Sequence, residues 1–327
     1  MADIPLPPLI EVAPSPHVAE PSSTTRRMMI DVFIAMLPVL AMAIIVFHWY
    51  AVVQMGVCVL SCLATEAFCC WVRGKPIPIG DYSAAVTGVI LGLSLPWAAP
   101  WYIGVLASVV AIGFGKVVYG GLGYNIFNPA MVGRAFVMLS FARELGAAAY
   151  VVLHSNLEIL TQPTPLTFAK EATRAMGAAS IWPLFVGQVN GSPGETSAVA
   201  LMVGGAYLCI RRSAAWGIPA GMLLAGFITA ELLYAAELTA YPPLYHLITG
   251  SFLFGAFFIA TDPVTSPVIH RGQFIFGVGI GVLSICIRVF SGYPEGVMFA
   301  VLLMNAAVPL INRWTIPKPV GGPIKTN

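Results

Sequence analysis

Two apolar stretches near the start of the chain decide the class of fold: MIDVFIAMLPVLAMAIIVF at residues 29–47 and YAVVQMGVCVLSCLATEAFCCW at residues 50–71. Each is close to the roughly 20 apolar residues that a membrane-spanning helix needs. Each contains a single charged residue, Asp31 in the first and Glu66 in the second. A transmembrane β-strand would instead alternate apolar and polar residues over about ten positions. The two stretches therefore predict a pair of transmembrane helices.

Similar segments recur through the 327 residues, of which 58% are hydrophobic and only 9% are charged. Soluble domains carry about 25% charged residues, so the composition excludes an ordinary soluble enzyme. The net charge of +2 does not favour nucleic acid as a partner. The sequence predicts an all-α integral membrane protein with about ten transmembrane helices, the further spans being 82–96, 99–118, 127–142, 196–210, 215–236, 244–261, 273–290 and 296–312.

Lys and Arg residues predict the orientation of these spans, because basic residues near span ends tend to remain in the cytoplasm. With the N-terminus inside, the opposite side receives only Arg143, Lys170, Arg174 and Arg288. We therefore expect both termini in the cytoplasm and one long loop on the outer face. The predicted cytoplasmic set is Arg26, Arg27, Arg73, Lys75, Lys116, Arg211, Arg212, Arg271, Arg313, Lys318 and Lys325.

The long loop divides the chain into two membrane halves that we expect to be inverted five-helix repeats. Short echoes favour a repeat, such as Lys116-Val-Val-Tyr-Gly in the first half and Arg288-Val-Phe-Ser-Gly in the second. An odd number of spans in each half would invert one relative to the other, as in many transporters, whose sites lie where discontinuous helices meet. The predicted divisions are an N-terminal tail at 1–27, membrane halves at 28–142 and 196–312, the loop at 143–195, and a C-terminal tail at 313–327.

Three segments interrupt the apolar helices with residues that are costly in lipid. In the first, Asn128 and Pro129 predict a helix start, since Pro is favoured in the first helical turn, and Arg134 follows within about two turns. The second contains Asp262 between two prolines, and the third contains Glu295. Ionisable residues at membrane depth are candidates for function, but both acids could equally cap helix ends.

Cysteine and histidine residues do not suggest a metal centre. The six cysteines include no CxxC pair, and the five histidines show no ligand spacing. Buried cysteines commonly act as small apolar side chains, so we predict no protein-bound metal.

Three runs of sequence carry a resemblance to a known family: GLGYNIFNPAMVGRAF at residues 121–136, ATDPVTSP at 260–267 and IRVFSGYPEGVMFAVLLMNAAVPLI at 287–311. They closely resemble the D subunit of the Rnf electron-transport complex and its homologue, the B subunit of the sodium-pumping NADH:quinone reductase. The resemblance covers nearly all of the apolar chain. It implies a flavin-carrying subunit of the bacterial inner membrane, with the long loop in the periplasm.

The resemblance also implies cofactors. Members of this family carry FMN on a threonine through a phosphoester, in a loop motif resembling Ser-Gly-Ala-Thr followed by a small residue and Leu. The matching stretch here is TQPTPL at residues 161–166, which indicates Thr164, although Gln162 and Pro163 replace Gly and Ala. Thr167 is the second choice, and an unmodified loop is the remaining alternative. The family further implies a non-covalent riboflavin in the membrane part, with Asn128 and Arg134 as its expected neighbours.

The function that we expect from this resemblance is electron relay in an ion-translocating ferredoxin:NAD oxidoreductase, together with a contribution to ion transport. The chain contains no NAD or iron–sulfur motif, so the full reaction needs partners. These would be membrane iron–sulfur subunits, the FMN-bearing G subunit, and subunits that react with ferredoxin and NAD. For the ion pathway we favour Asp262. The alternatives are a quinone-reducing role, as in the sodium pump, and a flavin-free channel or secondary transporter.

Overall fold

Helices account for the regular structure of the described chain. The computed structural model describes residues 24–76, 78–142, 144–145, 181–187, 191–293 and 295–317, and these contain no strand. The α-helices are α1 (Thr25–Phe47), α2 (Trp49–Val72), α3 (Ser83–Ser94), α4 (Trp101–Ile112), α5 (Pro129–Ser140), α7 (Ile181–Val186), α8 (Ala198–Ile210), α9 (Gly217–Ala235), α10 (Pro243–Ile248), α11 (Phe252–Phe254), α12 (His270–Phe290) and α13 (Val297–Thr315). Two π-helical turns, η2 (Gly113–Val117) and η6 (Gly255–Ile259), extend α4 and α11, and η1 (Ile79–Asp81) and η5 (Pro193–Glu195) are 3-10 turns.

Each of the ten predicted spans contains helix, but their lengths differ. Only α1, α2, α9, α12 and α13, among the helices of the described residues, are long and apolar enough to cross a membrane by themselves. Helices α3 and α5 have 12 residues each, which is about 18 Å against a hydrocarbon core of about 30 Å. The eighth predicted span is broken at Thr249 and Gly250 into α10 and the α11–η6 segment. The all-helical class is confirmed, whereas ten crossing helices are not.

Local sequence explains where the helices begin. The side chain of Asn128 accepts a hydrogen bond from the Met131 N–H at 3.3 Å, and Pro129 occupies the first turn of α5, as predicted. Thr24 caps α1 in the same way through the Arg27 N–H. Such caps satisfy backbone donors that lack a partner at a helix start. The Asn128-Pro129 pair therefore sets the start of α5 within the bundle.

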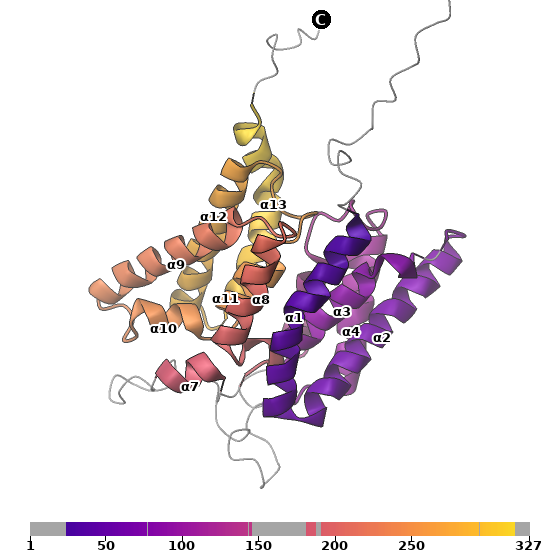
Figure 1. Cartoon of the computed structure of the whole chain (residues 1–327), viewed down its shortest axis with the longest axis horizontal. Coiled ribbons are helices and arrows are strands. Elements are labelled where there is room, and N and C mark those ends of the chain that lie inside the picture. The colour runs from indigo at the N-terminus through magenta and orange to yellow at the C-terminus, as the bar shows by residue number, and fades with distance from the viewer. Residues whose placement is uncertain are drawn as a thin grey trace, which may run out of the picture.

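The first residue of α1 and the last residue of α13 lie at the same end of the bundle (Figure 1). We call this the terminal end. Helix α7, which lies within the predicted outer loop, is at the opposite end (Figure 1). The start of α1 and the end of α13 thus lie at the end of the bundle opposite α7.

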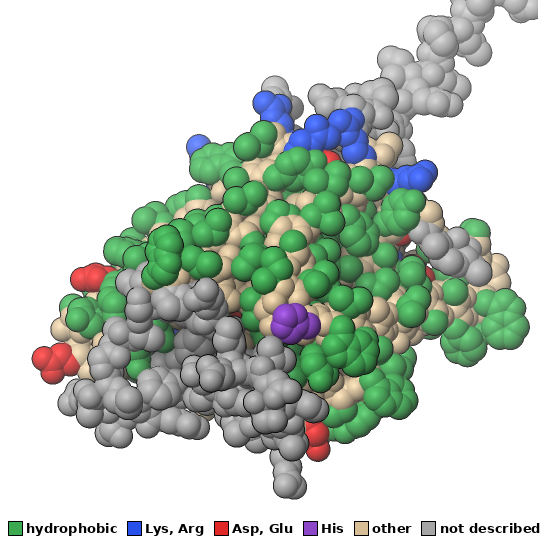
Figure 2. All heavy atoms as spheres, turned by 60° about the horizontal axis from the view of Figure 1, so that its bottom comes forward, with side chains coloured by type: hydrophobic (Ala, Val, Ile, Leu, Met, Phe, Trp, Pro, Cys, Tyr) green, Lys and Arg blue, Asp and Glu red, His purple; other side chains and the backbone are tan. Residues whose placement is uncertain are grey.

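Exposed basic side chains gather at the terminal end, as Figure 2 shows along its upper edge. The exposed acids Glu231 and Glu237 lie toward the other end, at the close of α9 and just beyond it. The exposed basic side chains and these two acids thus lie toward opposite ends of the bundle. The exposed cations of the described residues are Arg26, Arg27, Arg73, Lys75, Arg211, Arg212, Arg271 and Arg313.

Six of the seven tryptophans form two exposed groups, one at each end of the bundle. Trp71, Trp216 and Trp314 lie at the terminal end, next to the ends of α2 and α13 and the start of α9. Trp49, Trp101 and Trp182 lie at the opposite end, at the starts of α2 and α4 and in α7. Tryptophan is enriched at both membrane–water interfaces, so the two groups mark two interfaces.

Helix packing follows the same order in each half. In the first half, α2 packs against α3 and α4, and α4 packs against α5. In the second half, α9 packs against α10 and α12, and α12 packs against α13. Helices α1 and α8, the first of each half, pack against each other. The core therefore consists of two similar bundles joined along α1 and α8.

Glycines allow α9 and α12 to approach closely. A Cβ atom at Gly221 would lie 2.5 Å from the carbonyl oxygen of Phe274, and one at Gly281 would lie 2.5 Å from that of Met222. Small residues serve this purpose at many interfaces between membrane helices. Gly56 of α2, in contrast, has open space where a Cβ atom would lie.

We expect Gly281→Ala to destabilise the folded protein by about 1–3 kcal/mol, because the added methyl group would overlap the Met222 carbonyl oxygen. Gly56→Ala adds the same group where there is room and should be tolerated. Thermal unfolding of both variants in detergent would measure the difference. Equal melting temperatures for the two variants would contradict the packing at α9 and α12.

Candidate functional site

A cavity opens between the two halves at the terminal end of the bundle. Its walls come from the starts of α1, α3 and α5, the ends of η2 and α8, η6, and residues 122–125 and 261–264. It encloses about 770 Å³ of space between atoms, its open mouth included. The walls of the cavity therefore come from both halves of the chain.

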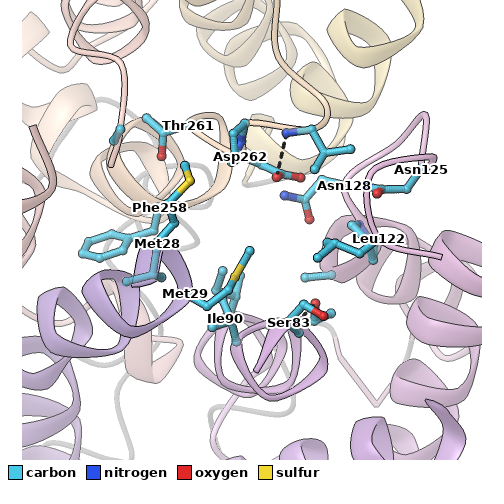
Figure 3. A pocket seen from close by; sticks show the side chains of 18 of the residues that line it. Met28, Met29, Ser83, Ile90, Leu122, Asn125, Asn128, Phe258, Thr261 and Asp262 are labelled. Carbon is cyan, nitrogen blue, oxygen red and sulfur yellow. Dashed lines mark hydrogen bonds between the residues drawn. The ribbon is translucent and has the colours of Figure 1, made fainter. Parts of the chain in front are cut away.

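Polar and apolar side chains both line the cavity. Figure 3 shows Asn125, Asn128 and Asp262 near one another, with Leu122 next to the two asparagines, while Thr261 lies near Phe258 and Ser83 lies near Ile90. Predominantly apolar walls with a few polar groups are typical of cofactor sites.

Asn128 joins the two halves at the cavity wall. Its backbone N–H donates to Asn305 Oδ1 at 3.1 Å, and its Nδ2 donates to the Ile259 carbonyl oxygen at 3.2 Å. Asn305 Nδ2 in turn donates to the Thr265 carbonyl oxygen at 3.0 Å. Sequence reasoning selected Asn128 but missed Asn305, whose signal was an amide within the apolar stretch that forms α13. The pair fixes α5 against the break that follows η6.

Asn125 brings a polar atom without a partner to the same wall. Its residue is 5% exposed, and the side-chain Oδ1 atom makes no hydrogen bond within the described structure. Its Nδ2 donates only a long hydrogen bond, of 3.4 Å, to the Phe127 carbonyl oxygen. A buried acceptor without a donor costs about 1–3 kcal/mol. Asn125 Oδ1 is thus a buried acceptor without a hydrogen-bond partner, on a residue that lines the cavity.

Asp262 lines the cavity at the end of the broken eighth segment. Its Oδ1 accepts from the Val264 N–H at 3.2 Å, and its Oδ2 accepts from the Thr265 hydroxyl at 3.0 Å. These contacts cap the turn at residues 262–265, which is the structural role that the sequence allowed. Because the same carboxylate also borders the cavity, capping and an ionic role are compatible.

Lys116 and Glu66 form a buried ion pair beside the cavity. Lys116 Nζ lies 2.5 Å from Glu66 Oε1 and 2.5 Å from the Ser83 hydroxyl oxygen, and each side chain of the ion pair is 2% exposed. Lys116 is one of the cations that the sequence assigns to the cytoplasmic side. It does lie toward that end, but the structure buries it, because η2 turns it inward against α2 and α3.

Arg134 does not line the cavity, although the sequence assigns it to the same flavin as Asn128. It lies six residues further along α5, about 9 Å at the helical rise. Its Nη2 contacts Glu295 Oε2 at 2.7 Å and Glu195 Oε1 at 3.8 Å. The structure therefore separates two residues that the sequence grouped, because α5 carries Arg134 away from the terminal end.

Glu295 and Arg288 form hydrogen bonds with backbone groups at the break in the eighth predicted span. Glu295 accepts hydrogen bonds from the N–H and the hydroxyl of Ser251, at 3.2 and 3.0 Å. The sequence assigns Arg288 to the outer side, but the structure buries it. The residue is 3% exposed, and its side chain donates to the carbonyl oxygens of His246 and Thr249. Glu295 is thus both a cap and an ion-pair partner.

The predicted flavin attachment site, Thr164, lies outside the described residues, as does Thr167. The described residues stop at Leu145 and resume at Ile181, the first residue of α7. Phe141, one residue beyond α5, contacts Tyr102 at the start of α4, away from the cavity. Both ends of the intervening segment therefore lie opposite the terminal end.

Comparison with known proteins identifies related chains over almost the full length. A model of the NQR2, RnfD, RnfE family matches residues 11–321. The chain is 42% identical to the D subunit of the Na(+)-translocating ferredoxin:NAD(+) oxidoreductase complex of Acetobacterium woodii, over 94% of this chain and 93% of that protein.

Two further relatives carry names that differ in the ion. The chain is 36% identical to the D subunit of the proton-translocating ferredoxin:NAD(+) oxidoreductase complex of Clostridium ljungdahlii, over 96% of each chain. It is 38% identical to the D subunit of the ion-translocating oxidoreductase complex of Stutzerimonas stutzeri, over 91% of this chain and 93% of that protein.

Proposed function

This chain belongs to the NQR2, RnfD, RnfE family, and on that premise we propose that it relays electrons through flavins within an ion-translocating ferredoxin:NAD oxidoreductase complex. Its relatives are named as the D subunits of such complexes, so the chain is an oxidoreductase and translocase subunit. Its own sequence lacks NAD and iron–sulfur motifs. The remaining redox steps then fall to other subunits, including the FMN-bearing G subunit and the iron–sulfur, ferredoxin- and NAD-reactive subunits.

The cavity at the terminal end is the observation that supports a flavin most directly. Its apolar wall, with Met29, Ile90 and Phe258, suits the faces of a flat ring system. Asn125 Oδ1, buried and unpartnered, suits an N–H donor on the polar edge of the ring. We assign the non-covalent riboflavin to this cavity. When bound, it would supply reversible electron transfer, and the protein would hold and orient it.

We expect Asn125→Leu to lower the content of non-covalent flavin in the purified complex about tenfold, which corresponds to about 1.4 kcal/mol of binding. Acid extraction followed by chromatography would measure the released flavin, while covalent flavin stays with the protein. Asn312→Leu is the matched control, because Asn312 hydrogen-bonds Val268 outside the cavity. Normal riboflavin content in Asn125→Leu would rule out this site.

We also propose that FMN is attached to Thr164 through a phosphoester. Support comes from the match of residues 161–166 to the family's loop motif and from the ends of the loop, which lie opposite the terminal end. An exposed hydroxyl can be esterified, and a tether keeps the flavin at high local concentration beside its redox partners. Two flavins at opposite ends of the bundle would place one redox centre near each face of the membrane.

Covalent flavin makes a denatured subunit fluoresce in a gel. We expect this fluorescence in the wild-type chain, its loss in Thr164→Ala, and its retention in the matched variant Thr167→Ala. The opposite result for the two variants would move the attachment to Thr167. A wild-type chain that never fluoresces would refute covalent attachment and favour a flavin-free channel or transporter.

For the architecture we propose two inverted five-segment repeats, with the terminal end in the cytoplasm. The equivalent order of helix contacts in the two halves supports the repeat. So do Lys116 and Arg288, the two buried cations that lead the echoed sequences. Lys116 contacts Ser83 of the preceding segment, and Arg288 contacts Thr249 of the preceding segment. An inversion would put these cations toward opposite faces of the membrane.

Asp262 is our candidate for the ion pathway. It borders the cavity at a broken helix, where backbone carbonyls can join a carboxylate around a cation. Its two oxygens accept from Val264 and Thr265, which keeps the carboxylate at the cavity wall. Electron transfer in the cavity would then occur close to the group that contacts the ion.

We expect Asp262→Asn to reduce ion transport by the reconstituted complex about tenfold, equivalent to about 1.4 kcal/mol, because the amide keeps the shape but loses the charge. Ion uptake into vesicles during ferredoxin oxidation would measure it. Glu237→Gln, which changes an exposed acid outside the cavity, serves as the control. Unchanged transport with unchanged ion dependence in Asp262→Asn would remove Asp262 from the pathway.

A further inference from the structure

Glu195 lies in the 3-10 turn η5, buried against α1, α3 and α11. Its side chain is 8% exposed, and that of Glu295 is 15% exposed. Both carboxylates approach the same atom, Arg134 Nη2, Glu295 at 2.7 Å and Glu195 at 3.8 Å. Two acidic groups thus share one guanidinium, and Glu295 holds it more closely.

Two buried oxygens in this turn make no hydrogen bond within the described structure: Glu195 Oε1 and Ser192 Oγ. Ser192 is 1% exposed and lies on the same turn, since its carbonyl oxygen accepts from the Glu195 N–H at 2.9 Å. The Ser192 side chain lies next to Glu195, so its hydroxyl can donate to the carboxyl group or accept a proton that Glu195 carries.

The charges around Glu195 are limited in number. Arg288 is the second cation within electrostatic reach, but it is bonded to the carbonyl oxygens of His246 and Thr249. Helix α3 and the short helix α11 contain no charged residue, and the charged residues of α1 lie in its first turns at the terminal end. Among the described residues, Arg134 is therefore the only cation that forms an ion pair with Glu195.

We propose that Glu195 and Glu295 hold one exchangeable proton between them, carried by Glu195 while Glu295 pairs with Arg134. Removing a carboxylate from water without a close counter-charge is strongly unfavourable, and like charges at one site oppose joint ionisation. Glu295 has the shorter contact with Arg134, at 2.7 Å, and it also accepts from the Ser251 donors, whereas Glu195 lies 3.8 Å from Arg134. The proton therefore belongs on Glu195.

The release and the uptake of one proton at Glu195 form a closed cycle. Glu195 releases H⁺ to a water molecule and becomes a carboxylate, and Arg134 is then shared by two anions. Uptake of one H⁺ from water restores the pair of Arg134 with Glu295. The site lies on the far side of the bundle from Asp262, because η5 leads into α8 at the end that carries α7. We draw this from the contacts of the acids alone, so it does not depend on the flavin assignments.

Infrared difference spectroscopy of the purified complex tests the proton directly, because a protonated carboxyl group has its own carbonyl stretching band that shifts in D₂O. At neutral pH, where an exposed glutamate is ionised, we expect this band in the wild type and its loss in Glu195→Gln. Glu295→Gln should also abolish it, since Arg134 would then pair with an ionised Glu195. Glu237→Gln, at the same end of the bundle, should leave the band unchanged.

Three results would overturn the inference. The band could survive Glu195→Gln, which would place the proton elsewhere. It could survive Glu295→Gln, which would make Glu195 neutral without any sharing. It could disappear when sodium chloride replaces choline chloride, which would mean that a sodium ion, and not a proton, occupies the site. An unchanged melting temperature would establish that the isosteric variants are folded.

Discussion

Backbone groups inside an apolar bundle must find hydrogen-bond partners within the protein, and the interior of this chain is arranged around that need. Several helices end within the bundle, so donors and acceptors at their ends meet side chains from other segments. Asn128 donates to the carbonyl oxygen of Ile259, Arg288 donates to that of His246, and Glu295 accepts from Ser251. Each of these polar residues lies far in sequence from the helix end that it satisfies.

The same polar residues create the two places where chemistry is possible. At the terminal end, Asn125, Asn128 and Asp262 surround a cavity. Toward the other end, Arg134 and Glu295 form an ion pair next to Glu195. A membrane protein with 9% charged residues thus concentrates its buried charge in clusters that hold the broken helices together. The proposed ion chemistry would use the same side chains that support the broken helices.

Sequence reasoning could predict features that depend on neighbouring residues. Apolar length located a helical segment in each of the ten predicted spans but not α7, which lies in the predicted loop, and the Asn128-Pro129 pair located the start of α5. It could not predict pairs that form only when distant segments fold together. Lys116 was counted with the cations of one face, but α2 and α3 supply Glu66 and Ser83, which allow it to be buried. The family resemblance groups Arg134 with Asn128 beside one flavin, yet the helix directs them to different clusters.

The two groups of exposed tryptophans have a mechanical consequence. Trp49 is the first residue of α2 and Trp71 is the last but one. They lie 22 residues apart, which is about 33 Å along the helix and close to the hydrocarbon thickness. A displacement of the whole subunit along the membrane normal would pull one group into lipid tails and the other into water. The tryptophans therefore hold the bundle at a fixed depth and oppose a rigid shift of the subunit along the membrane normal.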